Sequence, residues 1–317
     1  KDSEFTVKDI KKGSRTRKAP IPFTTSTLQQ EASKALNFST QKTMRIAQQL
    51  YEGVDIKGRG TIGLITYLRT DSTRVSETAE VQVKEFIESK YGDSYMAKEI
   101  NSKKSNKKIQ DAHEAIRPTD VNLMPEEVKD QLPRDLFRLY QLIWRRFVAS
   151  RMENSVYETT NVKVNAGKYI FNASTSKLDF DGFMKVYTDS DNEKVVTNNT
   201  IAKLEKDSKL EFEKFEENQH FTQPPAHFTE AALVKAMEEQ GIGRPSTYAP
   251  TITTIIARRY VTREKKNLYV TELGEAVNNV MKTEFSVIVD TQFTANMESL
   301  LDAVEEGTIE WKTVIRN

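Results

Sequence analysis

The chain has 317 residues, of which 37% are hydrophobic and 29% charged, and this length and composition are typical of a soluble globular protein with two or three domains. Cysteine is absent, which excludes disulfides and thiolate-bound zinc or iron–sulfur sites and favours a cytoplasmic protein. No apolar run approaches the roughly 18 residues that cross a membrane, whereas the formal net charge of +1 is compatible with a local patch that binds nucleic acid.

The amino-terminal segment is polar and basic, and it lacks the apolar core of a signal peptide. Within it, Phe5–Val7 predicts a short strand. Because the chain starts at Lys1 rather than at a methionine, we expect it to be a fragment of a longer protein.

Two helices are predicted next. Ser26 or Thr27 would cap the first, which runs to about residue 36, and Ser39 or Thr40 would cap the second, which ends at residue 53. Residues 54–63 contain three glycines and predict a loop whose backbone approaches another group closely.

The second predicted helix carries Gln48 and Glu52 one turn apart, so these two side chains share a face. From the residues alone, they are two solvated polar groups.

The stretch Gly63–Arg74 starts apolar and turns abruptly polar. In an extended segment, Tyr67, Arg69 and Asp71 point one way, and Leu68 and Thr70 point the other way. A phenol is a poor nucleophile while protonated; a neighbouring guanidinium favours the phenolate and also holds phosphate oxygens. Tyr67 is therefore a candidate nucleophile with Arg69 as its anion clamp, although a bare Tyr-x-Arg triplet more often lies on an ordinary surface.

A third helix is predicted from Ser72 or Ser76 to residue 90, followed by the string Ala112–Pro118. This string contains His113, a residue type that can hold or pass a proton near a phosphate, and Arg117, a candidate phosphate contact. The other two histidines, at 220 and 227, have no neighbours with metal-ligand spacing.

A long helix is predicted over 135–152, with apolar residues at helical spacing. From residue 156 the period changes to two, which predicts hairpins: strands at 156–164 and 169–174 around a turn at Gly167, and short strands at 183–186, 194–197 and 210–215.

The last part of the chain predicts a helix from Thr229 to Gly241, a turn, and a second helix capped by Ser246. A short hairpin at 259–270 follows, so the unit is a winged helix-turn-helix, and two helices at about 272–284 and 294–306 come after it. The second helix begins with a positive dipole end, to which Arg244, Ser246 and Thr247 add phosphate donors.

Three strings, Ile65–Thr73, Ala112–Pro118 and Gly241–Tyr248, resemble motifs of the type IA DNA topoisomerases, specifically the bacterial topoisomerase I group, and they occur in that family's order. The resemblance covers nearly the whole chain. It implies a mixed α and β, multidomain fold, in which mainly helical domains are joined by an antiparallel β hinge into part of a toroid. The implied domains are a β hinge at 1–19 and 154–224, a helical domain at 20–153 and a winged-helix domain at 225–317.

The resemblance also implies the activity. Such an enzyme relaxes negatively supercoiled DNA without ATP: its tyrosine cuts one strand through a 5′-phosphotyrosine, another strand passes, and the break is resealed. The implied partners are single-stranded and negatively supercoiled DNA, and the protein is expected to be a monomer. The implied catalytic residues are Tyr67, Arg69 and His113. The implied DNA-binding residues are Gln48, Glu52, Thr70, Asp71, Arg117, Arg244, Ser246 and Thr247.

Two parts of that family have no counterpart in this sequence. No Asp-x-Asp-x-Asp string represents the metal-binding amino-terminal domain, and no cysteines represent the carboxyl-terminal zinc repeats. We therefore expect Mg²⁺ to be bound by the missing domain of the parent enzyme and not by this chain, which is expected to bind single-stranded DNA without turning it over.

Two other functions are compatible with parts of the pattern. One is a nucleic-acid-binding module without catalysis. The other is a tyrosine nickase of the rolling-circle type, which is disfavoured because that chemistry needs a histidine cluster for its metal.

Overall fold

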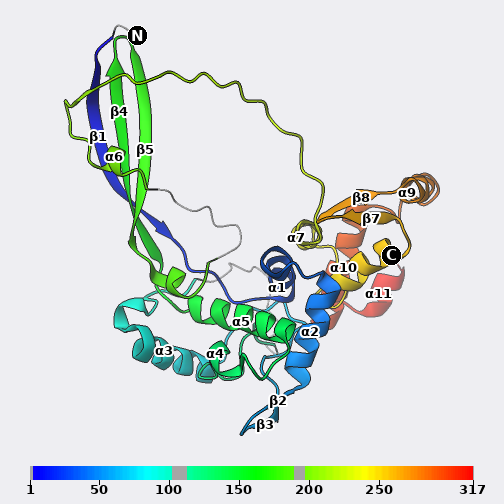
Figure 1. The fold of residues 1–317 in the computed structure, drawn as a ribbon. Helices are drawn as coiled ribbons and strands as arrows, with labels where there is room; N and C mark the ends of the chain where they lie inside the picture. Colours follow the sequence, from blue (N-terminus) through cyan, green and yellow to red (C-terminus); the bar gives the residue numbers. More distant parts are fainter. Residues whose placement is uncertain (1–2, 102–112, 189–196, 317) are drawn as a thin grey trace. The chain divides into compact units, whose positions relative to one another are not determined.

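The computed structural model describes residues 3–101, 113–188 and 197–316 (Figure 1). Its contacts divide the chain into two compact units. One unit comprises Lys1–Pro20, Val83–Asn101 and Val148–Pro224, and the other comprises Ile21–Gln82, Ser102–Phe147 and Pro225–Asn317. Within the described ranges, no helix is both long enough and apolar enough to cross a membrane. The division into three domains remains a prediction.

The first unit is built on a four-stranded sheet of order β5-β4-β1-β6, in which every paired strand is antiparallel. Its strands are β1 (Phe5–Arg17), β4 (Ser155–Ala166), β5 (Tyr169–Phe180) and β6 (Lys209–Leu210). Figure 1 shows β1, β4 and β5 running side by side. The unit also contains η2 (Asp93–Tyr95), η3 (Gly182–Lys185), α6 (Asn199–Ala202) and the end of α3 (Glu77–Tyr91).

The long hairpin of this sheet confirms the predicted change of period. Thr160, Val162, Val164 and Ala166 alternate with more exposed residues along β4, and Val162 and Val164 pack with Val7 in a small core. Only a short strand is predicted at Phe5–Val7, yet β1 extends over 13 residues. Its polar second half is a strand because it pairs with β4 along its whole length.

Two predicted strands of this unit are wrong. Phe183–Lys185 lie in the 3₁₀-helix η3 and Val186 follows it; Gly182 at the start of η3 has a positive φ of 50°, and a Cβ there would lie 2.5 Å from the carbonyl oxygens of Glu153 and Asn154. At 210–215 only Leu210 belongs to a strand, since β1 begins opposite it, at Phe5, and leaves nothing for the following residues to pair with. The predicted strand at 194–197 lies outside the described residues except for Thr197.

The second unit is mainly helical and includes two small hairpins. Its elements are α1 (Thr25–Glu31), the π-helix η1 (Ala32–Leu36), α2 (Thr40–Glu52), β2 (Val54–Ile56), β3 (Gly60–Ile62), the start of α3, α4 (Pro125–Val128), most of α5 (Arg134–Ala149), α7 (Glu230–Gln240), α8 (Tyr248–Ala257), β7 (Val261–Glu264), β8 (Asn267–Val270), α9 (Glu272–Glu284), α10 (Thr291–Glu305) and α11 (Trp311–Arg316).

Helix caps in this unit follow the sequence at some places and not at others. Ser39 caps α2 and Thr229 caps α7, as predicted. The cap of α1 is Thr24, which forms a capping box with Thr27, and not Ser26, whose hydroxyl donates to Glu238 of α7 at 2.7 Å. The Ser26 side chain, which the local sequence assigns to the helix cap, instead makes a tertiary contact with α7.

The predicted glycine-rich loop at 54–63 is instead the hairpin β2–β3. Its turn uses Gly58 and Gly60, which both have positive φ. The expected close approach occurs at Gly63, the last residue of the predicted range, where a Cβ would lie 2.6 Å from the carbonyl oxygen of Tyr51. Gly63 thus lets the chain leave the hairpin directly beside the end of α2.

Helices α7 and α8 enclose a core of Val234, Met237, Tyr248 and Ile252. Glu230, only 5% exposed, joins this part to α2: its carboxylate accepts from the backbone and hydroxyl of Thr40 and pairs with Arg263 of β7. The succession of α7, α8 and the hairpin β7–β8 confirms the predicted order of elements, and α9 and α10 lie where the sequence predicts two further helices.

Candidate active site

The polar stretch around Tyr67 has no regular secondary structure and is held from two sides. On one side, the Thr25 hydroxyl donates to the carbonyl oxygen of Leu68 at 2.7 Å and accepts from the Thr70 amide at 2.9 Å, and the Thr25 amide donates to the Thr70 carbonyl oxygen at 2.9 Å. On the other side, the Thr66 amide donates to the Arg117 carbonyl at 2.9 Å. The start of α1 and the segment 115–119 therefore fix the backbone on both flanks of the tyrosine.

Alternation along this stretch is as predicted. Leu68 and Thr70 are buried, whereas Arg69 and Asp71 are exposed and Tyr67 is half-buried. The buried side chains anchor the segment, so the intervening polar side chains are displayed on one face.

The ring of Tyr67 lies in contact with two other rings. Its centroid is 5.3 Å from that of His113 and 5.5 Å from that of Tyr51, which meets it edge-on. Among the described residues the Tyr67 hydroxyl has no hydrogen-bond partner. The ring contacts therefore hold Tyr67 through its aromatic face and edge and not through its hydroxyl.

A chain of hydrogen bonds lies beside this ring. Gln48 donates from its amide nitrogen to Glu52 at 2.6 Å and accepts through its amide oxygen from Arg69 at 3.2 Å. The predicted sharing of a face on α2 is thus correct, and the amide of Gln48 connects the guanidinium to a carboxylate. The hydrogen bond from Arg69 to Gln48 holds the guanidinium against α2, on the side of the segment that also displays Tyr67.

Thr70 is not available to a ligand in this structure. It is 2% exposed, and its hydroxyl accepts a hydrogen bond from the amide of Ser72 at 3.0 Å. The Thr70 side chain anchors the backbone that displays Arg69 and Asp71, and its predicted contact with DNA stays a prediction.

Arg117 is also occupied by protein groups. Its guanidinium donates to Glu114 at 2.7 Å and to the carbonyl oxygen of Pro118, and its side chain is only 12% exposed. Burial works to raise the pKa of Glu114, but the hydrogen bond and charge of Arg117 outweigh it and hold that pKa below its usual value. A phosphate contact by Arg117 would require these bonds to be exchanged.

Helix α8 begins differently from the prediction. Its N-cap is Thr247, whose hydroxyl turns back to accept from the Arg244 amide at 2.8 Å, and Ser246 is an exposed residue of the preceding turn. Burial raises the pKa of Tyr248 to about 12, and the carboxylates of Glu238 and Asp71 add to the rise. Asp71 therefore lies close enough to the start of α8 to act on it electrostatically.

Arg244 forms the most extensive ion pair of this region. It donates through Nε and Nη2 to the two carboxylate oxygens of Asp302 at 3.0 and 2.8 Å, and through Nη1 to Gly243 at 2.7 Å. These bonds attach α10 to the turn between α7 and α8. In this structure Arg244 stabilises the packing of α10, and a phosphate would have to compete with Asp302 for its guanidinium.

We expect Arg244→Ala to lower the free energy of unfolding by about 1–3 kcal/mol, because a partly buried, charge-assisted pair is lost. Urea denaturation of Arg244→Ala, with Asp302→Asn as the matched variant, measures this. If both variants are equally weakened and bind DNA with an unchanged salt slope, Arg244 acts through Asp302. Unchanged stability together with a salt slope reduced by about one would instead assign it to a phosphate.

The structure adds residues that sequence reasoning does not single out. Tyr51 contacts the Tyr67 ring, and it lies three residues after Gln48 on the same face of α2, so helical spacing contains a signal for it. Thr25 has no such signal, because its bonds to the tyrosine segment span more than 40 positions of sequence.

The described part of the chain contains no group of three or more histidine and carboxylate side chains that could hold a metal ion. The two carboxylates of the candidate site are Glu52, which accepts a hydrogen bond from Gln48, and Asp71, which follows Arg69 by two residues. These residues do not fit a Mg²⁺ site, which needs several oxygen ligands around one point.

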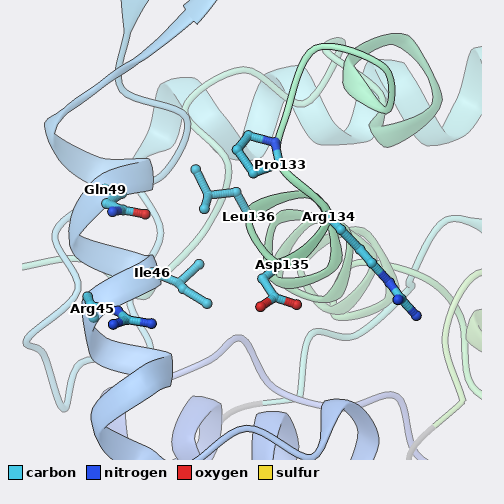
Figure 2. A pocket seen from close by; sticks show the side chains of 7 residues that line it. All are labelled: Arg45, Ile46, Gln49, Pro133, Arg134, Asp135 and Leu136. Atoms are coloured by element: carbon cyan, nitrogen blue, oxygen red, sulfur yellow. The ribbon is translucent and has the colours of Figure 1, made fainter.

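A cleft of about 510 Å³ lies between α2 and the start of α5, and Figure 2 shows its lining from close by. It is lined by Arg45, Ile46, Gln49, Pro133, Arg134, Asp135 and Leu136. Asp135 is paired with Lys42 of α2 at 2.6 Å. None of the predicted site residues lines this cleft, so it is separate from the tyrosine site.

The site brings together a phenol whose hydroxyl has no hydrogen-bond partner among the described residues, a guanidinium two residues later, and polar side chains from α2 and the start of α8. Comparison with known proteins gives the class, since the family model described as DNA topoisomerase matches residues 1–316, and the chain belongs to that family.

The particular relationship is to bacterial topoisomerase I. The solved structure of full-length topoisomerase I from Thermotoga maritima is 42% identical and superposes with a TM-score of 0.86, over 99% of this chain and 51% of that chain. The family indicated by the three motifs is thus confirmed, as is a mixed fold of helices and antiparallel sheets. The chain spans about half the length of that relative.

Proposed function

We propose that this chain is the tyrosine-bearing part of a type IA topoisomerase and relaxes negatively supercoiled DNA as part of the longer enzyme. The observation that carries the proposal is the placement of Tyr67: its ring is held by Tyr51 and His113, its hydroxyl has no partner among the described residues, and Arg69 follows two positions later.

In the proposed reaction, the Tyr67 oxygen attacks a phosphorus atom of one DNA strand. A new bond forms from Tyr67 to the 5′-phosphate, and the bond from phosphorus to the 3′ oxygen breaks. The phenol gives up its proton and the leaving 3′ oxygen takes one up. The phosphotyrosine conserves the diester, so the reverse step reseals the strand without ATP.

The neighbouring side chains have roles that follow from their positions. Arg69, held by Gln48, stabilises negative charge on the phosphate oxygens as it develops. His113 contacts the phenol ring and orients it or assists proton movement. Gln48, Glu52, Asp71, Ser246 and Thr247 position the single strand, and α7, α8 and β7–β8 act as a winged helix that binds DNA.

In the parent enzyme, Mg²⁺ held by a separate amino-terminal domain would supply further charge neutralisation at the phosphate. We propose that the parent acts as a monomer in the cytoplasm. A DNA-binding module without catalysis is the second candidate, favoured by the lack of a three-residue metal cluster among the described residues.

We expect the chain alone to bind single-stranded DNA but not to relax supercoiled plasmid, even with Mg²⁺. Binding needs only the surfaces described above, whereas turnover needs a partner for the phosphate charge and an acid for the leaving oxygen. Fluorescence anisotropy with a labelled oligonucleotide and a plasmid relaxation gel measure the two properties.

The deciding arm adds the metal-binding domain of a topoisomerase I, with Mg²⁺, to the chain and end-labelled single-stranded DNA. A covalent adduct on the fragment that carries the 5′-phosphate of the break supports the proposed enzyme. No adduct in the presence of normal binding favours the module without catalysis. Robust relaxation by the chain alone would show that its chemistry is complete.

A further inference from the structure

A second cleft, of about 360 Å³, adjoins the candidate active site. It lies where α2 packs on α8. Its lining residues are Gln41, Met44, Arg69, Pro245, Ser246, Ala249, Pro250, Thr253 and Thr254. None of these residues is acidic.

The lining combines two kinds of surface. Met44, Pro245, Ala249 and Pro250 are apolar and offer flat or deformable contact area. Gln41, Ser246, Thr253 and Thr254 carry amide or hydroxyl groups, each able to donate and to accept hydrogen bonds. A mostly apolar cleft with a few convergent polar groups is typical of a site for a small planar group.

Arg69 connects this cleft to the tyrosine. Its side chain lines the cleft and also donates to Gln48, and Arg69 is two residues from Tyr67 on the same face of an extended segment. A strand whose phosphate lies at Arg69 would therefore have an adjacent nucleoside at the mouth of the cleft.

We propose that this cleft, which we name the α2–α8 slot, receives one nucleobase of the DNA strand whose phosphate lies at Arg69. The proposal rests on the proposed function. The apolar residues contact the face of the base, and the amide and hydroxyl groups meet its edge, while the positive charge of Arg69 suits the phosphate. The slot is thereby a determinant of where the strand is held for cleavage.

The binding of this chain to two oligonucleotides of equal length tests the slot. One is a twelve-residue thymidine strand, and the other has the same sugar–phosphate backbone with abasic residues throughout. Both present the same phosphates, so their affinity ratio isolates what the bases contribute. We expect wild type to prefer the thymidine strand.

Met44→Ala removes an apolar contact from the slot. We expect it to reduce the ratio of affinities for the thymidine and abasic strands about fivefold, which is somewhat less than the typical effect of removing an aromatic side chain that stacks on a base. Affinity for the abasic strand should stay unchanged. Gln49→Ala, on another face of α2 and lining the other cleft, is the matched control and should leave both affinities unchanged.

A measurement on wild type covers the case in which Met44→Ala fails to fold. A strand carrying 5-iodouracil is irradiated in the complex, and the crosslinked peptide is sequenced. A crosslink in the peptides around Met44 or around 249–254 supports the slot. Crosslinks confined to other peptides, or an unchanged preference in folded Met44→Ala, would overturn it.

The outcomes also separate this inference from the proposed function. Equal wild-type affinity for both strands would contradict base binding in the slot but would remain compatible with an enzyme that binds single-stranded DNA. Failure to bind either strand removes both proposals.

Discussion

Tyr67→Phe is expected to abolish the covalent DNA adduct and all relaxation in the complete enzyme, while DNA binding changes by less than about twofold. The substitution removes only the hydroxyl, which has no partner among the described residues, and the ring keeps its contacts with Tyr51 and His113. The nucleophile is lost and its surroundings are kept. Adduct formation is measured on denaturing gels with end-labelled single-stranded DNA and Mg²⁺, and binding by anisotropy.

Tyr51→Phe is the matched control for that experiment. It also removes a single phenol oxygen, from the ring that packs edge-on against Tyr67, and it should retain the adduct. An adduct that persists in Tyr67→Phe, or disappears in Tyr51→Phe, would place the nucleophile elsewhere.

Arg69→Lys should slow cleavage by about 10²-fold with much smaller loss of affinity. Lysine preserves the charge, but it lacks the planar fork that can bond Gln48 and a phosphate oxygen at the same time. Removing one preorganised donor from a developing charge typically costs this much in rate. Single-turnover cleavage at saturating enzyme separates the rate from the affinity.

Arg45→Lys provides the control for Arg69→Lys. It makes the same chemical change on α2, at a residue that lines the other cleft, and it should cleave at the normal rate. A normal cleavage rate for Arg69→Lys would contradict the proposal that Arg69 stabilises the phosphate charge. Equal slowing in both variants would point to a general electrostatic effect.

The sequence by itself determined those features whose information is local. Alternation at Tyr67 to Asp71 follows from neighbours two apart, and the shared face of Gln48 and Glu52 follows from residues four apart. The caps at Ser39 and Thr229 also use neighbouring residues. The family was recognisable for the same reason, because each of its three motifs is a continuous string.

Only the tertiary structure decided which polar side chains are free. Arg244 matches a phosphate-binding pattern, yet its guanidinium binds Asp302, 58 positions away. Thr70 and Arg117 have partners close in sequence, the amide of Ser72 and the carboxylate of Glu114, but only the fold shows that Thr70 is buried and that the Arg117–Glu114 pair is partly buried. A periodic pattern indicates the face on which a side chain lies. It does not indicate which residue, distant in the sequence, binds that side chain in the folded protein.

The same reason separates the predicted from the unpredicted parts of the fold. β1 is a strand over 13 residues because β4 pairs with it, although its own second half is polar. Residues 211–215 form no strand because β1 begins at Phe5, opposite Leu210. The α2–α8 slot likewise exists only where two helices, about 200 residues apart in the chain, pack together. Hydrogen bonds and burial between distant segments decide such features, and no local pattern contains them.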